Sequence, residues 1–331
     1  MHMADALLSP GVGAVMWGAA AAGVGHAARR LRSAPEGRAS LMGVLGAFVF
    51  TAQMINFAIP GTGSSGHLVG GLLLAVLLGP HAALVVMTSI LAVQALFFAD
   101  GGLLALGANI ANMGLVPCYV AYPLYRRLAG ADPTPARRAA AAVAAAVAGC
   151  EIGALGVVLE TTASGIASLP AGTFLLLMLP IHLPIGLVEG GVTAAVVSYL
   201  AQARPEWAAG GPASAAGAGR GLLAAVAAAA VVTGGCLAWT ASDLPDGLEW
   251  SVARVTGTAG EAGVAGAVSR AHDLFSGLQE RTAFLPGYAF RSPAAGERLG
   301  TSVSGLVGGG LTLALAGLFG WAISRRRAGP G

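Results

Sequence analysis

The sequence predicts an all-α fold, a polytopic bundle of about nine transmembrane helices. Of its 331 residues, 56% are hydrophobic and only 10% are charged, and the mean hydropathy is +0.75. A soluble domain carries roughly 25% charged residues. Apolar runs long enough to cross about 30 Å of hydrocarbon recur along the chain, separated by short arginine-rich segments. These three observations together indicate an integral membrane protein.

Eight apolar runs are long enough to be individual spans. They cover residues 10–28, 39–58, 82–99, 103–124, 139–159, 171–201, 222–241 and 303–323. A ninth run, 68–79, is shorter, and its Gly70, Gly71 and Gly79-Pro80 break suit a tilted or partial helix that its neighbours bury. Hydropathy alone leaves the crossing of this ninth run open.

The arginines decide the predicted orientation. They gather in the segments around 29–38, 126–138, 204–220 and 325–327, which the positive-inside rule places in the cytoplasm. All four segments can be inside only if run 68–79 also crosses. We therefore expect nine spans in the cell (inner) membrane, with the N-terminus outside and the C-terminus cytoplasmic. Met1, the loop 61–67 and the loop 242–302 then share the outer face.

The chain divides into two predicted units. Residues 1–203 form a seven-span unit, and 222–331 form a two-span unit around the outer loop 242–302. The intervening segment 204–221, rich in Gly, Ala and Ser, is predicted to be a flexible cytoplasmic linker. The outer loop holds seven of the chain's 15 acids together with five aromatic residues. Aromatic side chains at this density predict a small folded module.

Composition excludes several kinds of chemistry. The chain has no lysine, so it cannot form a Walker A phosphate loop or a lysine Schiff base. Cys118, Cys150 and Cys236 stand far apart in apolar stretches, which favours small core residues over a thiolate metal site or disulfides. Asp5 and Pro10 precede the first apolar run without a basic start, so we expect no cleaved signal peptide.

The first two residues can chelate a metal ion. The α-amine of Met1, the amide nitrogen of His2 and the His2 imidazole close two fused rings on one ion. The amide binds only when deprotonated, and the resulting planar nitrogen set selects Ni(II) or Cu(II). One position in the plane stays open. We expect Met1 to be retained, because the bulky His2 hinders its removal.

His67, in "GTGSSGHLVGG", is the candidate for the open position. Its glycine-rich loop can bend sharply and approach another segment closely, and it lies on the same predicted face as Met1. Asp5 is expected to accept the second ring N–H of a ligating imidazole, and Ser65 and Asn109 are further candidates for supporting hydrogen bonds. A solvated His2 and an incidental His67 are the alternatives.

Polar side chains within the predicted spans have two interpretations. The amides can line a substrate path or hold helices together; they are Gln53, Asn56, Gln94, Asn109 and Asn112. The ionisable groups can serve function or stabilise the bundle; they are Glu151, His182 and Glu189. His26 and His81 lie at predicted cytoplasmic ends and are assigned no role.

Several motifs resemble one family. "MHMADALLSP" resembles the MHxxDGxLSP start of the substrate-capturing membrane subunits of nickel and cobalt energy-coupling-factor (ECF) importers, the CbiM/NikM type. "GTGSSGHLVGG", "LGANIANMG" and "HLPIGLVEGGVTAAVV" follow in that family's order. "SDLPDGLEW" resembles the PDGLE motif of the NikN/CbiN-type accessory subunit. Two positions differ from the pattern: Ala6 replaces the usual glycine, and Gly287 stands where relatives often have an acid.

The resemblance implies a non-enzymatic importer component. It implies that Met1, His2 and His67 hold the ion, that a transmembrane scaffold subunit and cytoplasmic ABC-type ATPases are partners in the lipid membrane, and that organic cofactors and nucleic acid play no part. Nickel is favoured because the loop reads "SSGHLVGG", as in nickel-type members, without the cysteine of many cobalt-type loops. Cobalt import for cobalamin synthesis is the alternative.

One interpretation comes from another class. "GTGSSG" contains a GxSxG-like arrangement, and an intramembrane serine hydrolase could use Ser64 or Ser65 as nucleophile and His182 as base. Such an enzyme needs a shielded Ser–His hydrogen bond, whereas these serines are predicted at the outer surface.

Overall fold

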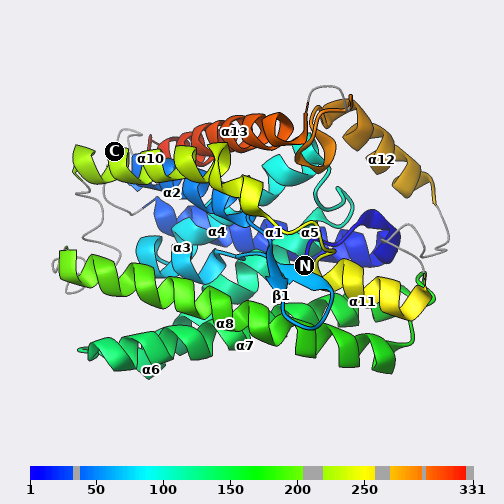
Figure 1. Ribbon diagram of the computed structural model, residues 1–331, viewed down its shortest axis with the longest axis horizontal. Coiled ribbons are helices and arrows are strands. Elements are labelled where there is room, and N and C mark those ends of the chain that lie inside the picture. Colours follow the sequence, from blue (N-terminus) through cyan, green and yellow to red (C-terminus); the bar gives the residue numbers. More distant parts are fainter. Residues whose placement is uncertain (33–37, 204–218, 258–268, 293–295, 326–331) are drawn as a thin grey trace.

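The protein is a helical bundle with a large apolar share, seen here in a computed structural model that describes residues 1–32, 38–203, 219–257, 269–292 and 296–325 (Figure 1). Four helical segments are long and apolar enough to cross a membrane: Pro80–Phe98, Pro135–Ser164 (α7), Ala171–Ala203 (α8) and Glu297–Arg325 (α13). Two shorter apolar helices are α2 (Arg38–Gln53) and α10 (Arg220–Gly235). The multi-pass class is confirmed, while nine spans and the orientation of the termini stay predictions.

The N-terminal segment lies inside the bundle. A short 3₁₀ turn, η1 (Asp5–Leu7), precedes α1 (Pro10–Leu31), which Ser9 caps by accepting a bond from the Val12 amide. Ser at the N-cap and Pro at the first helical position both favour a helix start there. Met3, Leu7 and Leu8 are completely buried. Met1 therefore lies beside β1 and α11, in the middle of the molecule (Figure 1).

A small hairpin and a partial helix follow α2. Strands β1 (Phe57–Ile59) and β2 (Ser64–Gly66) pair antiparallel. Helix α3 (Gly71–Leu78) is almost entirely buried, but eight residues rise only about 12 Å, too little to cross the hydrocarbon alone. Gly79, with φ of 82°, separates α3 from α4 (Pro80–Val93). The expected run 68–79 is thus a partial helix.

Wide π turns interrupt the next two helical runs. Helix α4 continues into η2 (Gln94–Phe98), and α5 (Leu106–Ile110) leads through η3 (Ala111–Leu115) and η4 (Pro117–Ala121) into α6 (Tyr122–Ala129). Such π segments often occur at functional sites. Here η2 carries Gln94 and leads directly to Asp100, and both side chains contact the imidazole of His2.

The C-terminal unit packs across the first unit. Helices α10 and α13 lie along α2, and α7 pairs with α8 on the other side of the bundle (Figure 1). Between α10 and α13 come the short η6 (Leu237–Thr240), α11 (Gly247–Thr256), α12 (Arg270–Thr282) and η8 (Pro286–Tyr288). Helix α11 contacts α8 and β2, and Asp246, directly before it, bonds the Met1 amine. Most of the expected linker, residues 204–218, lies outside the described residues.

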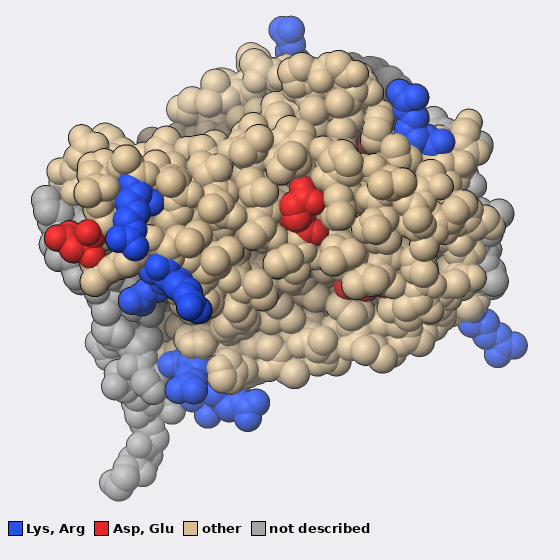
Figure 2. Space-filling model, turned by 90° about the horizontal axis from the view of Figure 1, so that it is seen from below, with Lys and Arg blue, Asp and Glu red and all other residues tan. Residues whose placement is uncertain are grey.

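The surface on the side of α6, α7 and α8 suits lipid. Figure 2 shows a face that is almost free of charged side chains, with arginines towards its edges. Exposed large apolar side chains on α7 and α8 include Leu159, Leu176 and Leu187. Cys118 and Cys150 are buried, as expected, but Cys236 is exposed, so the prediction of a core position is wrong for that residue, which ends α10.

Candidate metal site

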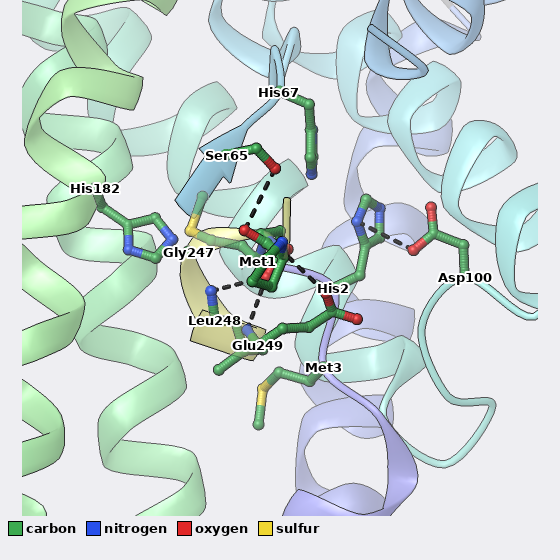
Figure 3. A network of polar contacts seen from close by, with 12 residues as sticks. Met1, His2, Met3, Ser65, His67, Asp100, His182, Gly247, Leu248 and Glu249 are labelled. Atoms are coloured by element: carbon green, nitrogen blue, oxygen red, sulfur yellow. Dashed lines mark hydrogen bonds and ion pairs between the residues drawn. The ribbon is translucent and has the colours of Figure 1, made fainter. Parts of the chain in front are cut away.

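The α-amine of Met1 forms an ion pair with Asp246. The amine lies 3.0 Å from Asp246 Oδ2, and Oδ1 accepts from the Leu248 and Glu249 amides at 2.8 Å each (Figure 3). Burial disfavours the charged amine, yet the charge and hydrogen bond of Asp246, together with the charge of Asp100, outweigh burial and raise the pKa of the amine above its usual value. Burial also opposes ionisation of Asp246, but the amine, the Glu249 amide and His67 together outweigh it, and the pKa of this carboxyl is lowered.

His67 presents one free ring nitrogen to the N-terminus. Its Nδ1 donates to the Leu68 carbonyl at 3.0 Å, which leaves the Nε2 lone pair available. Its ring stacks against that of His2 with centroids 5.2 Å apart. Burial, and then the charge of the Met1 amine, lowers the pKa of His67 to about 4. The imidazole is therefore neutral at pH 7, as a metal ligand must be.

A chain of buried amides fixes the tautomer of His2. Gln53 Nε2 donates to the Val69 carbonyl at 2.7 Å, and Gln94 Nε2 donates to Gln53 Oε1 at 2.8 Å. Gln94 Oε1 must then accept from His2 Nε2, 3.1 Å away. The neutral His2 ring thus carries its lone pair on Nδ1, the atom that closes a chelate ring with the residue's own amide. These amides support the site as well as the packing.

Asp100 lies beside His2. Its Oδ1 is 3.4 Å from His2 Nδ1, and its Oδ2 accepts from the Tyr288 hydroxyl at 2.5 Å. Tyr288 belongs to η8 in the C-terminal unit. That unit therefore contributes two groups next to the candidate ligands, Asp246 and Tyr288.

Ser65 joins the hairpin to the PDGLE motif. Its amide donates to the Pro245 carbonyl at 2.8 Å, and its hydroxyl donates to the Leu244 carbonyl at 2.7 Å. The Ser64 hydroxyl likewise contacts the Pro245 carbonyl. Among the described contacts, neither hydroxyl bonds an imidazole, so the hydrolase interpretation lacks its nucleophile–base pair. Ser65 instead holds Asp246 close to His67.

Asn109 and Asp5 form hydrogen bonds with backbone groups, not with the imidazole of a candidate ligand. Asn109 accepts from the Met3 amide at 2.8 Å and donates to the Met3 carbonyl at 3.2 Å. Asp5 Oδ1 accepts from the Ala105 amide at 3.0 Å. The carboxylate next to His2 is thus that of Asp100, whereas Asp5 and Asn109 fix the course of the segment that follows His2.

Glu189 clamps the segment after His67. Its carboxylate accepts from the Val69 amide at 2.7 Å and from the Gly70 amide at 3.0 Å. Gly70 has φ of 78°, a left-handed conformation that a Cβ atom disfavours and glycine adopts readily. Glu189 and His182, seven positions apart on α8, each bond elsewhere rather than to one another, since His182 Nδ1 contacts the Met178 carbonyl at 2.7 Å. Glu151 is half-buried.

The site opens onto an acidic cavity of about 680 Å³ between the two units. His2 and His67 are among the residues that line it. The charged residues around it are Asp5, Asp100, Asp243, Asp246, Glu249, Glu297 and Arg298. Six carboxylates against one guanidinium make a negative potential that concentrates cations near the two histidines.

Side chains alone do not form a metal site in the part of the chain that the structure describes. Within the described ranges, no group of three or more His, Cys, Asp or Glu side chains is placed to hold a metal ion. The sequence signals Asp100 only by its position as a single acid after the apolar run 82–99. Asp246 belongs to the PDGLE motif, but nothing in the sequence connects it with Met1.

Fold and site together define a class: multi-pass membrane proteins in which the Met1 amine, His2 and His67 lie beside an acidic cavity. Residues 2–207 match the model of the CbiM family, described as a cobalt uptake substrate-specific transmembrane region, and residues 220–325 match the PDGLE domain. The chain belongs to the CbiM family and carries a PDGLE domain at its C-terminal side.

Known relatives include fused proteins of this kind. The fused nickel transport protein NikMN of Rhodobacter capsulatus is 34% identical over 99% of this chain and 100% of its own length. A putative fused NikMN of Archaeoglobus fulgidus is 40% identical over 62% of this chain and 67% of its own. The crystal structure of a transition metal transporter is 31% identical, with a TM-score of 0.55, over 61% of this chain and 93% of that one.

Proposed function

We propose that the chain binds Ni(II) at the extracytoplasmic face and delivers it across the membrane as the substrate-specific component of an ECF-type importer. The ligands in this proposal are the Met1 amine, the His2 amide and Nδ1, and the His67 Nε2. A planar set of four nitrogens favours Ni(II) over Co(II). The observation that carries the proposal is that the His67 ring stacks on that of His2 and lines a small cavity together with Met1, while both histidines also line the acidic cavity.

The energy for transport would come from other chains. Without lysine, this chain has no Walker A loop, so cytoplasmic ATPases would hydrolyse ATP and a transmembrane scaffold subunit would transmit the motion. The family of substrate-specific transmembrane regions to which the chain belongs supports this division of labour.

The PDGLE unit would control access to the nitrogens. In this proposal the Met1 amine must become a ligand, but it forms an ion pair with Asp246, whose Oδ2 lies 3.0 Å from the amine nitrogen. An arriving ion would have to replace this ion pair, since the amine binds metal only after losing its proton. The motif would thus close the site when it holds no ion and withdraw as the ion binds.

Titration of the purified chain with Ni(II) and Co(II) side by side tests the proposal. We expect Ni(II) to bind at least about tenfold more tightly than Co(II), in line with the order of divalent affinities for nitrogen ligands, and to give a yellow, low-spin complex. His67→Ala, which removes the fourth nitrogen, should weaken Ni(II) binding at least about 100-fold. Tighter binding of Co(II), or a green octahedral nickel spectrum, would contradict the proposed site.

A further inference from the structure

Asp100 places a carboxylate close to a proposed ligand atom, although the two atoms cannot form a hydrogen bond with one another. Its Oδ1 lies 3.4 Å from His2 Nδ1, and both residues line the acidic cavity (Figure 3). Because the ring proton of neutral His2 is on Nε2, Nδ1 and the carboxylate oxygen both carry lone pairs. Two such acceptors close together suit a cation, and another group must hold the carboxylate in this position.

Tyr288 of the C-terminal unit holds the other oxygen of this carboxylate. Its hydroxyl donates to Asp100 Oδ2 at 2.5 Å, a short distance typical of hydrogen bonds from a hydroxyl to a charged oxygen. Its ring stacks on Phe98, with centroids 5.0 Å apart and an interplanar angle of 18°. The Leu285 amide, three residues before Tyr288, donates to the Phe97 carbonyl at 3.3 Å. Packing and backbone contacts away from the proposed ligands therefore set the position of the hydroxyl.

The backbone on both sides of this hydrogen bond has a rare conformation. Ala99, directly before Asp100, has φ of 53°, and Tyr288 itself has φ of 62°. Within the described ranges, these are the two non-glycine residues with positive φ. A Cβ atom disfavours this conformation, which persists only where surrounding contacts determine it and is concentrated at functional sites. The two outliers therefore indicate that the fold maintains the contact between Tyr288 and Asp100 for a functional reason.

The distance between the two acceptors determines whether the carboxylate can bind the same ion as His2. Bonds from a divalent transition metal to nitrogen or oxygen are about 2.0–2.2 Å long, so two ligand atoms at right angles lie about 3 Å apart. The observed 3.4 Å between Asp100 Oδ1 and His2 Nδ1 is slightly too long. A small movement of the carboxylate would make it a ligand, and its hydrogen bond to Tyr288 opposes that movement.

We propose that Tyr288 restrains Asp100 just beyond bonding distance of the transported ion and thereby makes the site select Ni(II) over Co(II); this inference rests on the proposed function. Four planar nitrogens suit low-spin Ni(II), whereas a carboxylate oxygen as a fifth ligand suits ions that prefer more ligands, Co(II) among them. The restrained carboxylate still attracts the ion by its charge but adds no bond. The C-terminal unit thus contributes to metal selectivity through a hydroxyl that acts on Asp100.

Tyr288→Phe tests this role in the full chain. Phenylalanine keeps the ring on Phe98 but lacks the hydroxyl, so Asp100 becomes free to approach the ion. We expect the ratio of Ni(II) to Co(II) affinity to fall at least about tenfold, and the nickel-loaded variant to gain a high-spin, paramagnetic fraction that the wild type lacks. The matched control is Tyr119→Phe, which removes a hydroxyl 2.9 Å from His81 Nδ1 and should leave ratio and spectrum unchanged.

Substitutions of Asp100 make each outcome decisive. Asp100→Asn, added to Tyr288→Phe, should restore the low-spin complex and the wild-type affinity ratio, because a neutral amide is a poorer ligand than a carboxylate. If Tyr288→Phe does not fold, Asp100→Glu gives the same reading, since its longer side chain can reach the ion despite the hydroxyl.

Three results would count against the role of Tyr288. They are a wild-type ratio and spectrum in the folded Tyr288→Phe or Asp100→Glu chain, an equal loss of affinity for both ions, and a changed ratio that Asp100→Asn does not restore. Nickel binding that survives His2→Ala would instead refute the proposed site itself, so the two failures are distinguishable.

Discussion

Two of the four nitrogens in the proposed site belong to the backbone, so the position of His2 matters as much as its side chain. A histidine at position 2 can close fused rings with the amine and its own amide. The structure adds the reason for the tautomer of its ring. Gln53 and Gln94 form a chain of hydrogen bonds that places the ring proton on Nε2 and leaves the lone pair of Nδ1 for a metal ion.

The protons on these nitrogens make binding depend on pH. Asp246 raises the pKa of the Met1 amine despite burial, so the amine is protonated at neutral pH, and the His2 amide also carries a proton. His67, with a pKa of about 4, releases none. Nickel binding should therefore release about two protons and tighten about 100-fold per pH unit near neutrality. Calorimetry in buffers of different ionisation enthalpy measures this number; release of no protons would exclude the amine and the amide as ligands.

Asp246→Asn separates the charge of this residue from its place at the start of α11. Asparagine caps a helix about as well as aspartate, so α11 should persist, but the Met1 amine loses its counter-charge and its pKa falls. The pH dependence of nickel affinity should shift to lower pH, with about tenfold tighter binding at pH 7. Asp273→Asn, in the first turn of α12, is the matched control. An unshifted curve for Asp246→Asn would show that the ion pair does not compete with the metal.

At the scale of elements, the segment between β2 and α3 holds His67 in place. Glu189→Gln removes the negative charge that accepts from the Val69 and Gly70 amides and turns an amide donor towards them. Hydrogen bonds to a charged group contribute about 1.5–3 kcal/mol, so we expect a lower thermal midpoint and about tenfold weaker nickel binding. Glu160→Gln, whose buried partner is the Asn112 amide, should leave nickel affinity nearly unchanged. Equal losses in both variants would argue for general destabilisation.

The elements that hydropathy can predict are the long ones. Runs 139–159, 171–201 and 303–323, and run 82–99 except for its last residue, lie in helices long enough to span the membrane. The β1–β2 hairpin and the π turns carry no such signal, because they depend on tertiary contacts.

Within the site, too, only the local part can be predicted from the sequence. Met1, His2 and His67 stand in short motifs, whereas Asp100, Glu189 and Asp246 join them from elements 98 to 245 positions away along the chain.

At the scale of the whole molecule, the two units meet at the candidate site. The Met1–Asp246 ion pair, the Tyr288–Asp100 hydrogen bond and the bonds from Ser65 to the PDGLE motif all cross between them. The acidic cavity lies at the same junction. Metal capture and the position of the C-terminal unit are therefore coupled in this account.

Removal of residues 222–331 tests how capture and delivery are divided. All proposed ligands lie in the first unit, so the truncated chain, once shown to be folded and monodisperse, should bind Ni(II) at least as tightly as the full chain. Uptake by cells that produce the partner subunits should fall severalfold, measured with radioactive nickel. Loss of binding by the folded first unit would place a ligand in the C-terminal unit.

The central claim is that the α-amine of Met1 is a nickel ligand, and one measurement tests it directly. The dissociation constant for Ni(II) is compared between the native chain and a chain whose α-amine is acetylated, with a chain extended at residue 331 as the control; no lysine side chain competes for the acetyl group. Because acetylation removes the amine nitrogen and with it one of the two fused chelate rings, we predict at least about 100-fold weaker binding and loss of the yellow low-spin band. Equal affinity and an identical spectrum in the two chains would contradict the account.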